Sequence, residues 1–172
     1  MEMDSLHRLF VEELRDVYDA EHQLIKALPM MAEKAHFPEL IRAFHEHLAQ
    51  TRVQVDRLDR AFELLGEKAQ GASCDGMKGL LKEGKHVAGS DGDAATVDAG
   101  LIAAAQKVEH YEIATYGTLC SWAETMGHTR VHELLSDNLA EEKETDRNLT
   151  ALAEQVINLD AVQGGFDGTM PR

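Results

Sequence analysis

Aromatic residues and proline are scarce in this sequence. Only 5% of its 172 residues are Phe, Trp or Tyr, only three are proline, and long stretches contain neither glycine nor proline. This composition argues against a β-sandwich, which is enriched in aromatic and β-branched side chains. Plentiful alanine and leucine instead favour helices that pack through aliphatic side chains. A chain of this length makes one well-buried domain more readily than two.

Cysteine and long hydrophobic runs are also nearly absent. Cys74 and Cys120 form no CxxC motif and have no partners at the spacing of zinc ligands. We therefore expect two free thiols and no structural zinc site. No run of about 18 apolar residues occurs, and the first ten residues have neither the basic nor the apolar part of a signal peptide. These absences predict a cytoplasmic protein without a membrane span.

Positive charge is in short supply. The chain has 17 basic and 31 acidic residues, for a net charge of -14. Such a charge repels nucleic acid and anionic membranes, so we expect neither as a partner. It suits a protein that attracts metal cations.

Apolar residues recur at helical spacing in four long segments, which predict four helices at residues 5–34, 38–65, 94–126 and 129–158. Pro38 is placed as a first-turn residue, and Gly127 suits the left-handed position after a helix. The turns at 35–37 and 127–128 are short, so each half of the chain should form a helical hairpin. From residue 159 the periodicity is lost, and we expect residues 159–172 to form a loosely ordered tail.

The segment 66–93 between the two hairpins is different. Its ends are rich in glycine and serine, and only its middle could make about three turns of weak helix. Helices of about 28 residues are roughly 42 Å long, and this segment is long enough to return the chain over that distance. The second and third helices should then run parallel. We predict an all-α fold in residues 1–158, a ferritin-like four-helix bundle with a long crossover at 66–93.

Acidic residues occur inside the apolar stripes of these helices. Measured in residues from the turns, Glu21 and Gln50 lie at matching depth, as do Glu112 with Glu142 and Glu109 with Asp146. Burying ionised carboxylates without compensation costs several kcal/mol or more. Two divalent cations would compensate Glu21, Glu109, Glu112, Glu142 and Asp146, and oxygen ligands suit iron, manganese or magnesium. The alternatives are shared protons or side chains that turn outward.

A polar face of the second helix lies beside its apolar stripe. His47, Gln50 and Gln54 share this face at spacings of three and four residues. His47 is interpreted either as a hydrogen-bonded histidine at the core boundary or as a metal ligand.

Three segments, DVYDAEHQLIKALP, LIAAAQKVEHYEIATYGTL and LAEEKETDRNLTALA, closely resemble the YciF/YciE-like bacterial stress proteins, a ferritin-like group. The resemblance covers about residues 5–158. It implies a helical bundle that dimerises, induction under stress, and a site similar to the di-metal centres of rubrerythrin and ferritin. The family's ligands then fall on Glu21, Gln54, Glu109, Glu112, Glu142 and Asp146. The family's biochemical activity is poorly defined.

One departure from the family pattern concerns the second helix. Relatives commonly read HLEET where residues 47–51 read HLAQT, so Gln50 replaces a glutamate. An amide is a neutral and weaker ligand than a carboxylate. The usual Glu-x-x-His pairs are also missing, since Thr145 stands where the fourth helix would place the histidine.

Three functions remain open from the sequence. The first is a di-metal oxidoreductase that acts on oxygen, peroxide or ferrous iron, with Tyr18 or Tyr111 supporting the ligands. The second is a protein that binds metal without turnover. The third is a structural stress-response dimer whose metal site has been lost through the change at Gln50.

Overall fold

The computed structural model describes residues 5–164, and no strand occurs in that range. The elements are α1 (Leu6–Lys34), α2 (Pro38–Leu65), α3 (Asp75–Ala88), α4 (Ala94–Thr125), α5 (Thr129–Leu152), the π-helical segment η1 (Ala153–Ile157) and α6 (Asn158–Gly164). The all-α fold with four long helices is therefore confirmed. The weak helix expected within the crossover is α3, which is 14 residues long.

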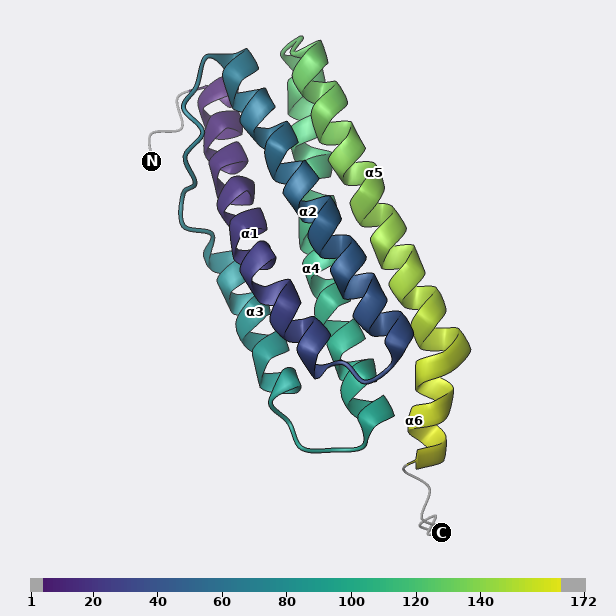
Figure 1. The fold of residues 1–172 in the computed structure, drawn as a ribbon. Coiled ribbons are helices and arrows are strands. Elements are labelled where there is room, and N and C mark those ends of the chain that lie inside the picture. Colours follow the sequence, from purple (N-terminus) through teal and green to yellow (C-terminus); the bar gives the residue numbers. More distant parts are fainter. Residues whose placement is uncertain (1–4, 165–172) are drawn as a thin grey trace.

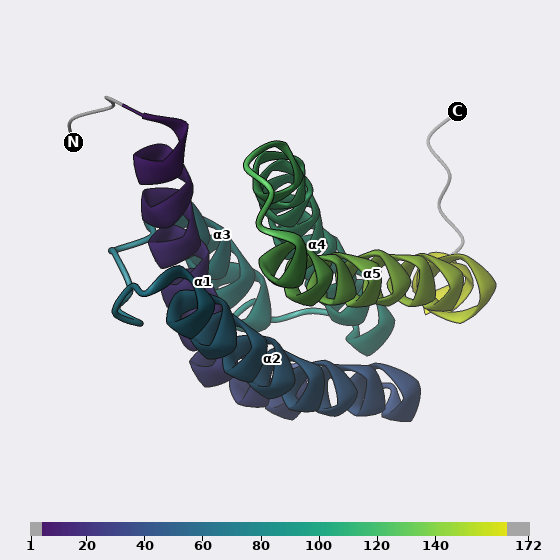
Figure 2. The same cartoon turned by 90° about the horizontal axis from the view of Figure 1, so that it is seen from above.

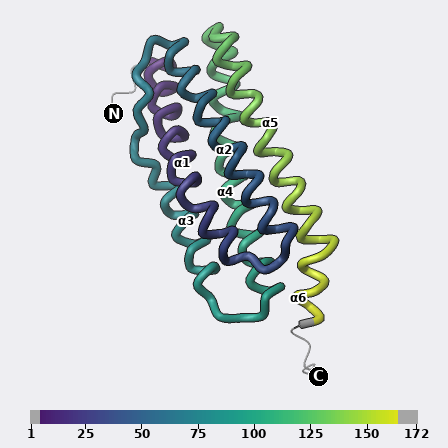
Figure 3. Tube along the Cα trace, in the orientation of Figure 1, coloured from purple at the N-terminus to yellow at the C-terminus, as the bar shows by residue number. Residues whose placement is uncertain are grey.

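The four long helices form two antiparallel hairpins. Figure 1 shows α1 and α2 as one hairpin and α4 and α5 as the other. After α2 the chain returns along α1 through residues 66–74 and α3, so α4 starts near the end of the bundle where α2 started. The trace in Figure 3 makes this return easy to follow. As predicted for a long crossover, α2 and α4 run parallel.

The helix ends follow from local chemistry. The Ser5 hydroxyl accepts a hydrogen bond from the Arg8 amide at 3.2 Å, and the Asp93 carboxylate accepts one from the Thr96 amide at 3.0 Å. Both are N-cap bonds that satisfy amides left unpaired by the first helical turn. At the other ends, Gly66 and Gly127 adopt φ values of 70° and 76°, a left-handed conformation that glycine takes without a steric penalty.

The interior consists of two apolar clusters. One lies towards the α1–α2 turn and includes Leu28, Leu40 and Leu101. The other lies towards the α4–α5 turn and includes Phe10, Phe62 and Leu119. The end view in Figure 2 shows the two hairpins facing each other around this interior. Between the two apolar clusters, at mid-bundle, lies a layer of buried polar and charged side chains.

The crossover helix is part of the packed structure. α3 packs on α1 and α4, and its Leu80 and Val87 are half-buried against the core. The apolar side chains of the crossover are therefore partly covered once α3 folds onto the bundle.

The C-terminal boundary also differs from the prediction. The helical path runs through η1 and then through α6 to Gly164. Ile157 at the end of η1 is fully buried, whereas Leu159 and Val162 of α6 are 56% and 67% exposed, so α6 continues the helix while its apolar side chains stay largely outside the core. The rest of the predicted tail, residues 165–172, lies outside the described residues.

Within residues 5–164, none of the helices has both the length and the hydrophobicity needed to span a bilayer.

A buried aspartate joins the two hairpins near the α1–α2 turn. The Asp98 carboxylate is fully buried and accepts hydrogen bonds from the amides of His36 and Phe37 at 3.0 and 2.8 Å. It also lies 3.1 Å from the His36 ring nitrogen Nδ1. Asp98 thus fixes the first turn of the chain to the start of α4.

Replacing Asp98 should destabilise the protein. Asp98→Ala leaves two backbone amides without their acceptor, so we expect the free energy of unfolding to fall by about 2–4 kcal/mol. Asp98→Asn retains one acceptor oxygen and should lose less than half as much. Urea denaturation of both variants and the wild type measures these differences. Equal stability of Asp98→Ala and the wild type would contradict the tethering role of Asp98.

Candidate metal centre

The polar layer at mid-bundle draws its side chains from all four long helices. Glu21 comes from α1, His47 and Gln54 from α2, Glu109 and Glu112 from α4, and Glu142 from α5. We call these six residues the mid-bundle cluster. Each of them is at most 4% exposed. The possibility that the acids turn outward is thereby excluded for Glu21, Glu109, Glu112 and Glu142.

Four members of the mid-bundle cluster lie close enough together to share an ion. One ligand atom from each of His47, Glu109, Glu112 and Glu142 lies within 4.8 Å of the others. The His47 nitrogen Nε2 is 3.3 Å from the Glu109 oxygen Oε1. Glu21 lies on the adjacent side, close enough to Glu112 for each carboxyl group to shift the pKa of the other. This buried His/Glu group could hold a metal ion.

Burial governs the charge state of the metal-free carboxyl groups. It raises the pKa of Glu21, Glu109 and Glu112 well above the usual value, and repulsion from neighbouring carboxylates raises each pKa further. Burial also raises the pKa of Glu142 to about 7. Without a cation, the cluster therefore retains protons at neutral pH.

Burial has the opposite effect on the histidine. It lowers the pKa of His47 to about 4, so the imidazole is neutral at physiological pH. Neither ring nitrogen has a hydrogen-bond partner. His47 is buried inside the bundle, with Nε2 next to the Glu109 carboxyl group. A neutral imidazole with a free nitrogen is the form that ligates metals.

Buried side-chain atoms without hydrogen-bond partners indicate whether these residues suit a metal ion. Within residues 5–164, every buried side-chain nitrogen or oxygen without a hydrogen-bond partner belongs to the mid-bundle cluster. They include both carboxylate oxygens of Glu112 and of Glu142, and the carbonyl oxygen of Gln54. Buried polar atoms are normally paired, so such a concentration in one layer requires an explanation. Divalent cations would satisfy these oxygen and imidazole nitrogen atoms by binding them as ligands.

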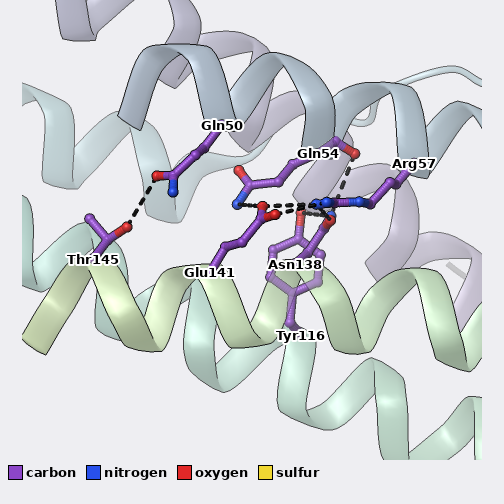
Figure 4. A network of polar contacts seen from close by, with 7 residues as sticks. All are labelled: Gln50, Gln54, Arg57, Tyr116, Asn138, Glu141 and Thr145. Atoms are coloured by element: carbon purple, nitrogen blue, oxygen red, sulfur yellow. Dashed lines mark hydrogen bonds and ion pairs between the residues drawn. The ribbon is translucent and has the colours of Figure 1, made fainter. Parts of the chain in front are cut away.

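A bidentate ion pair borders the cluster between α2 and α5. Arg57 donates two hydrogen bonds to the Glu141 carboxylate, at 2.7 and 2.8 Å. The Gln54 nitrogen Nε2 donates to the same carboxylate at 3.2 Å (Figure 4). Since a carboxylate only accepts, this contact fixes which end of the Gln54 amide is its nitrogen. The ion pair therefore orients the amide of a cluster residue.

The same arginine orients a second amide. Arg57 donates to the Asn138 oxygen Oδ1 at 3.0 Å, so the Asn138 nitrogen must point the other way, where it donates to the Tyr116 hydroxyl at 3.1 Å (Figure 4). Tyr116 in turn donates a short hydrogen bond to the Glu21 oxygen Oε1. That bond occupies Oε1 and leaves Oε2 of Glu21 free for a ligand.

Asp146, a predicted ligand, and Gln50, a secondary candidate, lie at the edge of the cluster. Asp146 is partly exposed, accepts a hydrogen bond from Gln106 at 3.1 Å and lies 3.5 Å from the His110 ring. Gln50 accepts a hydrogen bond from Thr145 at 3.4 Å and is half-buried (Figure 4). The structure thus brings together Glu21, Gln54, Glu109, Glu112 and Glu142, and keeps Asp146 and Gln50 about one turn away.

The prediction that Tyr18 or Tyr111 supports the metal ligands was wrong. Tyr18 donates to Asp59 at 2.8 Å and Tyr111 donates to Asp16 at 2.6 Å, so both hydroxyl groups are engaged elsewhere. The tyrosine that contacts the cluster is Tyr116, which the sequence analysis did not single out. Its spacing could have identified it, since it lies four residues after Glu112 on the same helical face, as Asn138 lies four before Glu142.

Comparison with known proteins agrees with this architecture. Residues 5–162 match the family described as Domain of unknown function (DUF892). Protein YciF of Escherichia coli strain K12 is 43% identical over 159 residues, which span 92% of this chain and 96% of that protein.

Solved structures of similar proteins have the same fold. The crystal structure of the E. coli stress protein YciF superposes with a TM-score of 0.88 at 43% identity and covers 91% of this chain and 99% of that one. YcfI of Rhodopseudomonas palustris, described as a proposed structural protein, has a TM-score of 0.85 at 43% identity and covers 87% of this chain and 95% of that one.

The metal-free protein should lose stability as the pH rises from 6.5 to 8. In this interval the folded state holds protons on cluster carboxyl groups, including Glu142 with a pKa of about 7, that the unfolded state has released. Each such proton lowers the free energy of unfolding by up to about 1.4 kcal/mol per pH unit. His47 acts in the opposite sense, but its effect fades above its unfolded pKa of about 6.5 and is small over most of this interval.

Denaturant unfolding in the presence of a chelator, repeated across the interval, measures the pH dependence. Glu142→Gln removes one of the titrating groups and should flatten the dependence. A stability that stays constant or rises from pH 6.5 to 8 in the wild type would contradict the protonated cluster.

Proposed function

The chain belongs to the DUF892 family and is YciF-like, and from this premise together with the mid-bundle cluster we propose that it is a stress-associated, ferritin-like protein that binds divalent metal. The proposal rests on one observation. Within the described residues, the buried polar side-chain atoms without hydrogen-bond partners all lie in this one layer. The association with stress rests on the E. coli relative, whose structure is that of a stress protein.

We propose two ions for each chain. Glu21, Glu109, Glu112 and Glu142 carry four negative charges when ionised, and two divalent cations balance that charge. The neutral imidazole of His47 and the carbonyl oxygen of Gln54 add neutral ligands. A mixed set of imidazole and carboxylate ligands suits iron first, and manganese or magnesium less well.

The chain's own residues would prepare the site for redox chemistry. Tyr116 holds Glu21 through Oε1, which directs Oε2 to the ion, and the two apolar clusters above and below exclude water. Bound iron would supply the redox chemistry by which oxygen or peroxide, as the electron acceptor, oxidises Fe(II) to Fe(III). Oxidation of added Fe(II) would show catalytic turnover. Without it, the chain only binds the metal.

A structural role without metal is the second candidate. It is favoured by the R. palustris relative, which is described as a proposed structural protein, and by Gln50 at the position of a family glutamate. In that case protons would occupy the cluster at neutral pH, and added metal would leave the protein unchanged.

Metal should stabilise the fold and chelation should reverse the effect. An ion that binds only the folded state adds about 2.7 kcal/mol at a hundredfold excess over its Kd, so the melting temperature should rise with Fe(II) or Mn(II). Glu142→Ala should abolish the rise because it removes a central ligand, whereas Glu133→Ala, which removes an exposed glutamate of the same helix, should retain it. Anaerobic thermal melts with each metal and with chelator provide the measurement.

Metal content and turnover separate the candidates. A wild-type melting temperature that ignores Fe(II), Mn(II) and chelator supports the structural role and rejects metal binding. If metal does bind, admitting peroxide or oxygen to the Fe(II)-loaded protein distinguishes an oxidase from a binding protein.

We also propose that the chain forms a homodimer. An open groove of about 690 Å³ runs between α3 and α4, with both small apolar and charged residues along it, among them Lys82, Glu83, Val87, Gly100, Ala103 and Lys107. A surface with charges of both signs can pair with a copy of itself about a twofold axis.

Light scattering at micromolar concentration should return about twice the 19.0 kDa mass of the chain. Ala103→Glu, which adds a charge in the groove, should shift the protein towards the monomer, while Ala49→Glu on an exposed part of α2 should not. A wild-type mass near that of one chain would reject the dimer.

A further inference from the structure

A small cavity leads to one side of the mid-bundle cluster. It lies between α2 and α5, has a volume of about 70 Å³, and is floored by α4. His47 and Glu109, two members of the cluster, form part of its wall. The remaining lining residues are Ala43, Phe44, Glu46, Gln50, Ala105, Thr145, Asn148 and Leu149.

The polar groups of this cavity are graded by depth. Glu46 and Asn148 are exposed at its rim, and Gln50 and Thr145 are half-buried and hydrogen-bonded to each other across it (Figure 4). His47 and Glu109 are buried at its inner end, with 4% and 1% exposure. The path therefore runs from an exposed carboxylate, past neutral oxygens, to a buried carboxylate and a neutral imidazole.

The inner end of the cavity contains atoms without partners. Both ring nitrogens of His47 and the Glu109 oxygen Oε2 lack hydrogen bonds. The volume of about 70 Å³ holds about two water molecules at roughly 30 Å³ each. A divalent cation with its full hydration shell cannot fit, so it must exchange waters for protein oxygens as it enters.

Further along the α2–α5 seam an ion pair bridges the two helices. There Arg57 and Glu141 form their bidentate pair, and Asn138 and Tyr116 fill the interior behind it (Figure 4). The Arg57 guanidinium is held by the Glu141 carboxylate and by Asn138, so these side chains occupy the seam beside Gln54. The cavity that cluster residues line lies on the His47 side.

We propose that this cavity is the entry port through which a divalent cation reaches the mid-bundle cluster, with Glu46 attracting it, Gln50 and Thr145 replacing part of its hydration shell, and His47 and Glu109 receiving it. The proposal rests on the metal-binding function proposed above and adds a route to it. It also gives Gln50 a role in transit in place of permanent ligation.

Filling the cavity tests the route directly. Ala43→Leu adds a side chain to the wall, and Ala49→Leu adds the same side chain to an exposed position of the same helix. Stopped-flow mixing of metal-free protein with Co(II), followed by visible absorbance, measures the rate of uptake. We expect Ala43→Leu to slow uptake by about tenfold or more, because the cavity is too small to hold both the side chain and the ion. The final amount bound should be unchanged, and Ala49→Leu should match the wild type.

Charge changes at the port provide a test that does not perturb packing. Glu46→Gln removes the rim charge and should slow uptake by about two- to threefold at low salt, an effect that high salt suppresses. Asp56→Asn removes a charge from an exposed position of the same helix away from the cavity and should have no effect. Gln50→Glu should accelerate uptake.

The outcomes separate the port from the site. Wild-type uptake rates in both Ala43→Leu and Glu46→Gln, with circular dichroism confirming that each is folded, would overturn the port and leave the metal centre standing. Absence of Co(II) binding by the wild type at any time would reject the proposed function and the port with it.

Discussion

The structure depends on the cost of burying four carboxyl groups and one imidazole in a single layer. When ionised, Glu21, Glu109, Glu112 and Glu142 repel one another, and burial removes them from bulk water. An apolar cluster on either side of the layer supplies the favourable burial that holds the bundle together. The two apolar clusters thus stabilise the fold, whereas the polar layer reduces its stability and gives it a chemical site.

The long crossover determines which side chains meet in that layer. Because residues 66–74 and α3 return the chain to the end where α2 begins, α2 and α4 run parallel and each hairpin contributes acids at the same depth (Figure 1). Asp98 fixes this arrangement by binding the α1–α2 turn to the start of α4. A short connection between the hairpins would reverse α4 and place its residues at other depths.

Around the layer, the α2–α5 seam carries an ion pair at one depth and a small cavity at another. The Arg57–Glu141 pair orients Gln54 and Asn138, and Tyr116, which accepts from Asn138, donates its own proton to Glu21 (Figure 4). The small cavity leads from the rim to the buried side chains of His47 and Glu109. Oriented side chains on one side and a cavity on the other fit the proposed metal site.

The sequence by itself determined the four long helices, the crossover and the central acids, because helical periodicity is local and a glutamate within an apolar stripe must face the interior. It did not determine that Tyr116 binds Glu21 while Tyr18 and Tyr111 bind outer aspartates, or that His47 is left without a hydrogen-bond partner. A tyrosine ring fits an apolar stripe wherever its hydroxyl points, and the partner of that hydroxyl comes from another helix. The same holds for Asp146 and Gln50, whose neighbours are set by how α2, α4 and α5 cross. Only the packing of the helices decides those contacts.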